Sequence, residues 1–261
     1  DAPPMNRPLR AVGGAACALA ALLLLPARAL AQVQVIISAG FAAAYEELLP
    51  ELERSSGITV STSRGGSVGP GPNTIPSQIR RGVQADVVIL AREGLDELIA
   101  EDRMVAGTDV DLASSGIGVV VRAGAPKPDI STVEALRQTL LRAASVSVST
   151  STSGRYLTTE LFPRLGIADE MAAKTLTSGA AAVGTGEAEL GLQQVSEVRA
   201  IPGTDFVGAI PEEVQYVTTY SAAVVAGSTH ADAARRLIAF LSSEGARQVI
   251  TSKGMEPGAR R

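Results

Sequence analysis

The chain has 261 residues and a formal net charge of −4, with 46% hydrophobic and 3% aromatic residues, no tryptophan and one cysteine. An acidic chain without a basic stripe argues against binding to nucleic acid or to an anionic membrane surface. So few aromatic side chains also disfavour sugar-stacking platforms and aromatic cages. The length allows one large domain or two lobes of about 100 residues each.

The beginning of the chain has the pattern of a secretory signal peptide. Arg7 and Arg10 follow Met5, and an apolar run over residues 11–25 leads to the small-x-small triplet at residues 29–31. These are the charged region, the apolar region and the cleavage site of such a signal. No later segment reaches the roughly 20 apolar residues of a membrane span. We therefore expect cleavage between Ala31 and Gln32 and a periplasmic protein without membrane insertion.

Removal of residues 1–31 changes the composition of the mature chain. It takes away Arg7, Arg10, Arg28 and Asp1, so that the 23 basic and 27 acidic residues become 20 and 26. It also takes away Cys17, which leaves neither a disulfide nor a thiol nucleophile. With a single histidine as well, the chain cannot form a conventional zinc site, and it contains no Walker or dinucleotide-binding motif. We therefore expect no metal and no cofactor.

The first part of the mature chain alternates β-rich runs with helical periodicity. Strands are predicted over residues 33–37, 58–61 and 86–90, and helices over residues 41–54, from Thr74 onward and over residues 94–100. A glycine- and proline-rich loop spans residues 64–73, and Pro76 lies near the first turn of the helix that follows. This alternation predicts a parallel sheet covered by helices on both faces.

Two longer valine-rich segments, residues 116–122 and 214–225, flank a second alternating unit. In that unit, helices are predicted over residues 132–141, 154–165 and 179–186, and strands over residues 146–149, 174–177 and 190–194. Helices over residues 229–241 and 244–250 then return to the first unit. We expect an α/β fold in which residues 32–113 and 222–261 form one lobe and residues 114–221 the other. Two crossover strands join the lobes, and the ligand cleft lies between them.

Several segments resemble the periplasmic molybdate-binding proteins of ABC transporters, which belong to the type II solute-binding class. They are residues 35–48, 65–67, 85–89, 152–156 and 187–192. The resemblance implies the two-lobed type II fold, a small anionic ligand, a transporter permease as a possible partner, and a monomer. A narrower resemblance, at residues 122–130 and 193–197, is to the branch of that superfamily that contains aconitate isomerase.

The residues themselves also indicate an anion site. Serine and glycine occur together at residues 38–40, 66–67, 153–154 and 178–179, each at a strand-to-helix turn or in a loop. Such turns present backbone N–H groups and the positive end of a helix dipole. Helix capping is the better explanation for any one of them alone, but four turns converging on one cleft favour a ligand site. The candidate ligand-binding residues are Ser38, Gly40, Phe41, Arg64, Ser67, Ser153, Gly154, Arg155, Gly179, Ala180 and Gln194.

The choice of ligand depends on departures from the molybdate-binding pattern. The resemblance implies a serine where this chain has Gly40 and a tyrosine where it has Gln194, whereas Ser67 and the Ser153-Gly154 turn are retained. Loss of two hydroxyl donors disfavours a tetrahedral oxyanion. Arg64 and Arg155 lie beside two of the turns, and a guanidinium group can bind a carboxylate through two parallel hydrogen bonds. The alternative is that both arginines are solvated surface residues. We predict a protein that binds a small anion, either a carboxylate or an oxyanion such as molybdate.

Two enzymatic alternatives remain. The sequence G-x-S-x-G at residues 65–69, with His230 downstream, fits the nucleophile elbow of a serine hydrolase, but Pro70 and Pro72 break the helix that must follow it. Aconitate isomerisation is the stronger alternative, because it needs a positioned base and donors for spread negative charge but neither metal nor cofactor. The candidates for the base are Tyr156, Glu187 and Lys127, and the sequence leaves the catalytic residue unassigned.

Overall fold

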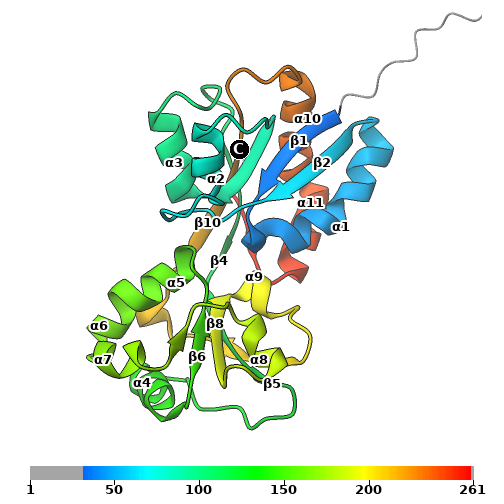
Figure 1. Ribbon diagram of the computed structural model, residues 1–261. Coiled ribbons are helices and arrows are strands. Elements are labelled where there is room, and N and C mark those ends of the chain that lie inside the picture. The colour runs from blue at the N-terminus through cyan, green and yellow to red at the C-terminus, as the bar shows by residue number, and fades with distance from the viewer. Residues whose placement is uncertain (1–31, 260–261) are drawn as a thin grey trace, which may run out of the picture. The chain divides into compact units, whose positions relative to one another are not determined.

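The computed structural model describes residues 32–259, which form two α/β lobes (Figure 1). The predicted signal peptide and its cleavage site involve residues 1–31 and lie outside the described residues. Within the described part of the chain, no helix combines the length and the apolar character needed to cross a membrane. The strands of the two lobes belong to two separate sheets.

The first lobe contains a six-stranded sheet in the order β11-β4-β10-β3-β1-β2. Its strands are β1 (Gln32–Ile37), β2 (Thr59–Arg64), β3 (Val87–Ala91), β4 (Val110–Ser115), β10 (Thr218–Val224) and β11 (Glu256–Pro257). β1 runs parallel to β2 and β3, whereas β10 runs antiparallel to both β3 and β4. The predicted parallel sheet is confirmed for β1, β2 and β3, the strands on which the prediction rested, and the strands that connect the lobes add antiparallel pairs to it. Strands that connect the lobes need no crossover helix within this sheet, so they can join it in antiparallel pairs.

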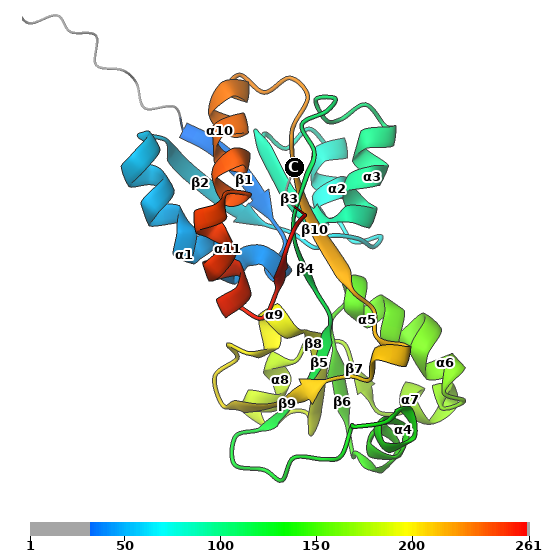
Figure 2. The same cartoon turned by 180° about the vertical axis from the view of Figure 1, so that it is seen from behind.

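Helices cover both faces of this sheet because its central strands bury side chains on both sides. Val35 and Ile37 of β1 pack in the cluster that includes α1 (Ala39–Ser56), α10 (Ala231–Leu241) and α11 (Glu244–Ser252). Ile36, between them, packs in the opposite cluster with α2 (Ile75–Arg80) and α3 (Arg92–Ala100). Figures 1 and 2 show these two sets of helices on opposite sides of the strands. Because successive side chains of β1 point to opposite faces of the sheet, this strand contributes to the hydrophobic core on both faces.

The second lobe contains a five-stranded sheet in the order β7-β6-β8-β5-β9. Its strands are β5 (Ile117–Arg122), β6 (Val146–Val148), β7 (Thr175–Leu176), β8 (Leu190–Gln194) and β9 (Thr204–Ala209). β6 is parallel to β7 and β8, and β5 is antiparallel to β8 and β9. One face carries α4 (Val133–Arg142), α5 (Thr152–Tyr156), a π-helical turn (Leu157–Leu161), α6 (Phe162–Arg164) and α7 (Ala168–Ala172). The other face carries α8 (Ala181–Thr185) and α9 (Val195–Val198).

Two strand segments carry the chain between the lobes. On the outward path β4 passes through Gly116 directly into β5, and the sequence analysis did not predict β4. On the return path the strand begins only at Thr218, because Val214 ends a 3-10 turn (Glu212–Val214) and is buried in the core of the second lobe. The predicted boundary after Ser221 falls inside β10. The domain limits at residues 113, 221 and 261 stay a prediction.

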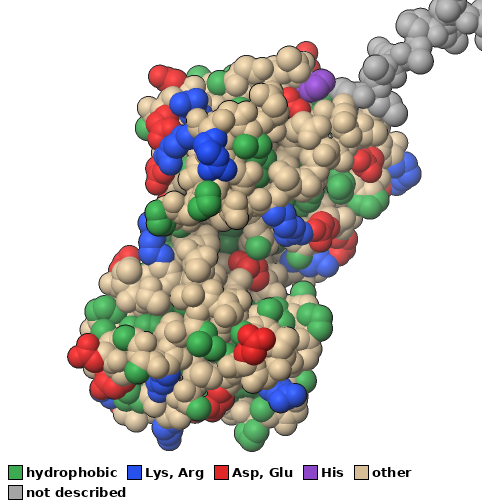
Figure 3. Space-filling model, in the orientation of Figure 1, with side chains coloured by type: hydrophobic (Ala, Val, Ile, Leu, Met, Phe, Trp, Pro, Cys, Tyr) green, Lys and Arg blue, Asp and Glu red, His purple; other side chains and the backbone are tan. Residues whose placement is uncertain are grey.

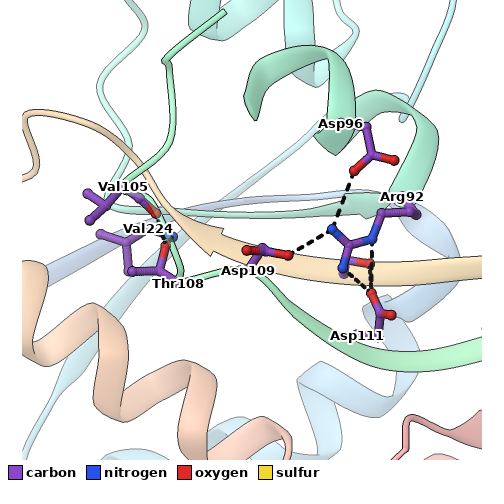
Figure 4. Close-up of polar contacts among 8 residues, drawn as sticks. Arg92, Asp96, Val105, Thr108, Asp109, Asp111 and Val224 are labelled. Carbon is purple, nitrogen blue, oxygen red and sulfur yellow. Dashed lines mark hydrogen bonds and ion pairs between the residues drawn. The ribbon is translucent and has the colours of Figure 1, made fainter. Parts of the chain in front are cut away.

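An ion-pair cluster attaches the outward path to the first lobe (Figure 4). Arg92, the first residue of α3, places Nη1 3.0 Å from Asp109 Oδ2 and 3.4 Å from Asp96 Oδ1. Its Nε donates to Asp111 Oδ1 at 3.0 Å, and the Ser221 hydroxyl on β10 donates to the same oxygen at 2.6 Å. The outgoing and returning strands are thus tied to each other and to α3.

Candidate functional site

A cavity of about 340 Å³ lies at the carboxyl ends of parallel strands from both sheets, and we call it the cleft cavity. Its lining comes from residues 38–40 after β1, residues 64–67 at the end of β2 and residues 149–153 after β6, together with Gln193, Gln194, Glu197, Asn73 and Tyr220. Figure 3 shows the surface hollowed between the lobes, where most of the atoms belong to uncharged polar side chains or to the backbone. The predicted position of the ligand site, at the carboxyl ends of the strands, agrees with this cavity.

A second cavity, of about 380 Å³, adjoins the first, and we call it the side cavity. The two share Ala39, Arg64, Gln193 and Glu197, and the side cavity adds Glu46 and residues 178–181. Arg64 and Glu197 therefore face both spaces. They are also the charged side chains that line the cleft cavity.

Two residues that line the cleft cavity, one from each lobe, have a buried hydroxyl group without a hydrogen-bond partner among the described residues. Ser38 is the N-cap residue of α1, but its side chain makes no capping bond, and the residue is 4% exposed. Thr152 opens α5 on the other side of the cavity and is also 4% exposed. An unmade hydrogen bond at a buried hydroxyl costs about 1–3 kcal/mol. Capping therefore does not explain Ser38, and a ligand that accepts hydrogen bonds would satisfy both groups.

Ser67 and Ser153 also lie at the cleft cavity, but each already makes one contact. Ser67 Oγ accepts the Ala91 N–H at 2.9 Å, so its own O–H remains free to donate. Ser153 Oγ lies 3.3 Å from Ser149 Oγ. Gly154 serves the turn itself, because a Cβ there would come within 1.7 Å of the Ser149 carbonyl oxygen. These residues combine donors with a tight turn that brings them close to a ligand.

Gly40 explains how a phenol reaches the cavity. A Cβ at this position would lie 1.9 Å from the phenolic oxygen of Tyr220, so a serine here and the present position of Tyr220 exclude each other. Burial raises the pKa of Tyr220 well above its ordinary value, and the phenol stays a hydrogen-bond donor. In the first lobe, β10 thus supplies a phenol to the cavity. In the molybdate-binding pattern the corresponding tyrosine stands at the position of Gln194, at the end of β8. The sequence analysis missed Tyr220 because it lies in an apolar strand far along the chain.

Gln194 has its amide engaged by the strands that connect the lobes. In the orientation that satisfies every neighbour, its oxygen accepts from the Thr218 hydroxyl at 2.7 Å, and its nitrogen donates to the carbonyl groups of Ser115, at 2.8 Å, and Gly116, at 3.2 Å. Gln194 lines the cavity but is only 2% exposed. Its polar atoms therefore join β4, β8 and β10, and its predicted contact with a ligand remains a prediction.

Three further predicted residues have their polar groups in other contacts or lie in the core. The Gly179 N–H donates to the Val148 carbonyl at 2.9 Å, and the Ala180 N–H donates to Gln193 Oε1 at 2.9 Å. Both residues line the side cavity instead of the cleft cavity. Phe41 is fully buried in the core of the first lobe, so only its backbone, in the first turn of α1, is near the site.

The two predicted arginines have different positions. Arg64 lines both cavities and forms an ion pair with Glu46 of α1. Arg155 is not among the lining residues and instead forms an ion pair with Glu93 of α3, which links the two lobes. The structure therefore brings Ser38, Gly40, Arg64, Ser67, Ser153 and Gln194 to one cavity and leaves Arg155 beside it.

Glu197 is the carboxyl group that lines the cleft cavity, and the sequence analysis gave it no role. It is half-buried on α9, and the Gln193 amide nitrogen donates to it. Burial raises the pKa of Glu197 to about 7, against the lowering effects of the Gln193 bond and of nearby Arg64. The spacing of four residues between Gln193 and Glu197, across the end of β8, was the one signal in the sequence for this pair.

The three residues considered as bases lie away from both cavities. Tyr156 is buried in the second lobe, and its hydroxyl donates to the Val214 carbonyl at 2.8 Å. Burial raises its pKa above the ordinary value of a phenol. Glu187 and Lys127 are exposed. None of the three lines the cleft cavity or the side cavity.

The serine-hydrolase arrangement does not form. Ser67 lines the cleft cavity, whereas His230 lines a different cavity of about 610 Å³ and lies 3.3 Å from Asp86 through Nδ1. The residues after Ser67 continue as a loop, and helix α2 begins only at Ile75. Over residues 32–259, no group of three or more histidine, cysteine, aspartate or glutamate side chains could hold a metal ion.

Comparison with known proteins agrees with this architecture. The family model described as bacterial extracellular solute-binding protein matches residues 33–256. Aconitate isomerase from Pseudomonas sp is 40% identical over 243 residues, which are 92% of this chain and 93% of that protein.

Two solved structures have the same fold at low sequence identity. The periplasmic molybdate-binding protein of Azotobacter vinelandii has a TM-score of 0.70 and 18% identity, with 88% of this chain and 100% of that chain covered. The sulfate-binding protein SubI from Mycobacterium tuberculosis H37Rv has a TM-score of 0.67 and 22% identity, with 87% of each chain covered. The predicted two-lobed periplasmic-binding fold is confirmed.

Proposed function

Because this chain belongs to the bacterial extracellular solute-binding proteins, we propose that it holds a small polycarboxylate between its lobes and isomerises it, as aconitate isomerase does. The observation that carries the proposal is the pair of unpartnered buried hydroxyls of Ser38 and Thr152, two residues that line one cavity from opposite lobes. A ligand with carboxylates at both ends can accept from both lobes at once. The extent and level of identity to the Pseudomonas relative support the same reaction.

The size and the charges of the cavity favour a carboxylate over a tetrahedral oxyanion. About 340 Å³ is within the range of small-molecule sites, whereas a single oxyanion would leave most of that space to water. Arg64 also pairs with Glu46, but its guanidinium group has five N–H donors and can offer others to a carboxylate of the ligand. The hydroxyls of Ser67 and Tyr220 add neutral donors. This donor set fits an unsaturated di- or tricarboxylate.

The proposed reaction needs only groups of the kinds that line the cavity. Movement of a double bond in aconitate removes a proton from the methylene carbon and adds one at the former vinyl carbon. The negative charge that develops between these events spreads over the carbon chain and its carboxylates, where fixed donors such as Arg64 and Tyr220 stabilise it. General acid–base catalysis supplies the proton transfers.

Capture for transport is the second candidate function. The fold that the chain shares with proteins named for molybdate and sulfate binding supports it. In that case the lobes would close on an anion and a permease would recognise the closed form. Export to the periplasm, a monomeric state and a permease partner are part of this proposal.

Proton NMR of trans-aconitate in heavy water, with a catalytic amount of the purified protein, separates the two functions. Appearance of the cis isomer is the expected result, with deuterium in the methylene position to the extent that the abstracted proton exchanges with solvent before one is returned. Absence of conversion by folded protein, with trans-aconitate or molybdate bound in calorimetry, would favour transport instead. A sample whose circular dichroism shows the folded state provides the control.

A further inference from the structure

An isomerisation of this kind requires a group that takes a proton from one carbon and returns it to another. We infer that Glu197 is this catalytic residue, acting alone as base and then as acid on a bound unsaturated tricarboxylate. The inference rests on the proposed function and assigns its proton carrier. It is drawn first from position, because Glu197 is the only carboxyl side chain among the described residues that line the cleft cavity.

The surroundings of Glu197 suit a proton carrier. The residue stands on α9 immediately after β8, and its side chain lies between the cleft and side cavities. The other charged or titratable groups that line these cavities are Arg64 of β2, Glu46 of α1 and Tyr220 of β10. Arg64 already pairs with Glu46, which leaves the carboxyl of Glu197 without an arginine partner in the recorded ion pairs of the described residues.

Gln193 acts as a positioning residue for this carboxyl. Its amide oxygen accepts the Ala180 N–H at 2.9 Å, and its amide nitrogen donates to Glu197 Oε2. Since both ends of the amide are fixed, the side chain cannot rotate freely, and it directs one carboxylate oxygen. The other oxygen, Oε1, remains available to a ligand in the cavity.

The acidity of Glu197 fits the task as well. A carboxyl with a pKa of about 7 is a stronger base than an ordinary glutamate, yet it is still substantially ionised at neutral pH. Catalysis by proton transfer is most efficient when the pKa of the group is near the working pH. Burial of the side chain is the largest cause of the raised pKa.

The proton balance closes with this one residue. The ionised carboxylate of Glu197 takes a proton from the methylene carbon as that C–H bond breaks, and the electron pair spreads over the allylic carbons and the adjoining carboxylates. The protonated carboxyl then delivers a proton to the former vinyl carbon, where a new C–H bond forms. The double bond has moved, Glu197 is again ionised, and no oxidant, reductant or metal is consumed.

Glu197→Gln tests the assignment, with Glu187→Gln as the matched control on an exposed glutamate outside both cavities. We expect Glu197→Gln to lower kcat for trans-aconitate by at least about 100-fold with KM changed less than about threefold, because loss of a general base removes about 10²–10⁴-fold. The wild-type kcat/KM should rise with pH through an ionisation near 7, and this rise should be absent in the variant. Glu187→Gln should match the wild type in both respects.

The outcomes distinguish this inference from the proposed function. If the wild type converts trans-aconitate and Glu197→Gln retains more than a third of its kcat, the inference is wrong and the proposed function is still supported. No conversion by the wild type would overturn both. Loss of trans-aconitate binding in Glu197→Gln, measured by calorimetry, would make Glu197 a binding residue and also overturn the inference. Gln193→Leu removes the bond that lowers the pKa of Glu197, so the pH profile should shift upward.

Discussion

Two carboxyl groups, one buried and one half-buried, lie at opposite ends of strands in the two lobes and have different environments. At the amino end of β3, Asp86 is 5% exposed, and its oxygens accept from the Gln34 N–H at 2.8 Å and the Ser228 hydroxyl at 2.6 Å, with His230 Nδ1 at 3.3 Å. At the carboxyl end of β8, Glu197 has one side-chain donor and faces open cavities. A carboxylate whose oxygens accept hydrogen bonds from several protein donors stabilises the fold. A carboxylate with few such donors remains available to bind a ligand or to transfer a proton.

Asp86→Ala gives the largest effect expected from this contrast. The variant leaves the buried Gln34 N–H and Ser228 hydroxyl without their acceptor, and breaking such a network costs about 3–5 kcal/mol of unfolding free energy. Isomerase activity at 25 °C should stay within twofold, since the site lies at the far end of the lobe. Urea denaturation and the NMR assay measure the two quantities. A fall in isomerase activity with an unchanged unfolding free energy would contradict the assignment of Asp86 to stability and of the opposite end of the strands to catalysis.

Glu197→Gln should instead stabilise the protein, and the gain should depend on pH. Below about pH 4.5 the carboxyl is protonated in both folded and unfolded chains, so the group costs nothing. Between about pH 4.5 and 7 the unfolded chain releases this proton while the folded chain, with its pKa of about 7, keeps it, so stability falls as pH rises across this range. This loss reaches about 3 kcal/mol above pH 7. Urea denaturation at pH 4 and pH 8 should show Glu197→Gln equal to the wild type at the lower pH and more stable at the higher; equal curves at both would contradict the raised pKa.

The parts of this fold that were predictable are those that sequence periodicity encodes. Val35, Ile36 and Ile37 form a continuous apolar run because both faces of β1 are covered, and that run predicted a buried strand. The serine and glycine turns after β1, β2 and β6 were placed at a cleft by the rule for α/β sheets, and Ser38, Ser67 and Ser153 do line it.

The parts that were not predictable depend on which distant segments meet. Tyr220 reaches the cavity only because β10 pairs with β3 and Gly40 leaves room for its ring, and neither fact is local in sequence. Arg155 follows a contact turn directly, yet it pairs with Glu93 of the other lobe. β4 was missed because its sequence VDLASS is short and half polar, although pairing with β10 makes it a strand.

Gly40→Ala tests the close approach on the cleft side. The added Cβ would lie 1.9 Å from the Tyr220 oxygen, so the ring must move, and such overpacking costs about 1–3 kcal/mol. In a Tyr220→Leu background the same substitution should cost much less, which a double-mutant cycle by thermal denaturation measures. Gly71→Ala, where a Cβ would meet nothing within 4 Å, is the matched control. Additive effects of Gly40→Ala and Tyr220→Leu would show that the two side chains do not compete for this space.

Ser38→Ala gives the smallest expected effect and separates ligand contact from helix capping most directly. The Ser38 hydroxyl has no partner among the described residues, so its removal should not lower the unfolding free energy and should raise it by about 1 kcal/mol, the cost of the unmade hydrogen bond. Binding of trans-aconitate should weaken about tenfold, since a hydrogen bond to a charged group contributes about 1.5–3 kcal/mol. Ser252→Ala, at an exposed serine of α11, should change neither quantity. A loss of stability above about 1 kcal/mol with unchanged binding would show that Ser38 stabilises α1 and does not contact the ligand. In that case a polar side chain at the cleft end of this sheet would have the same stabilising role as Asp86 at the other end.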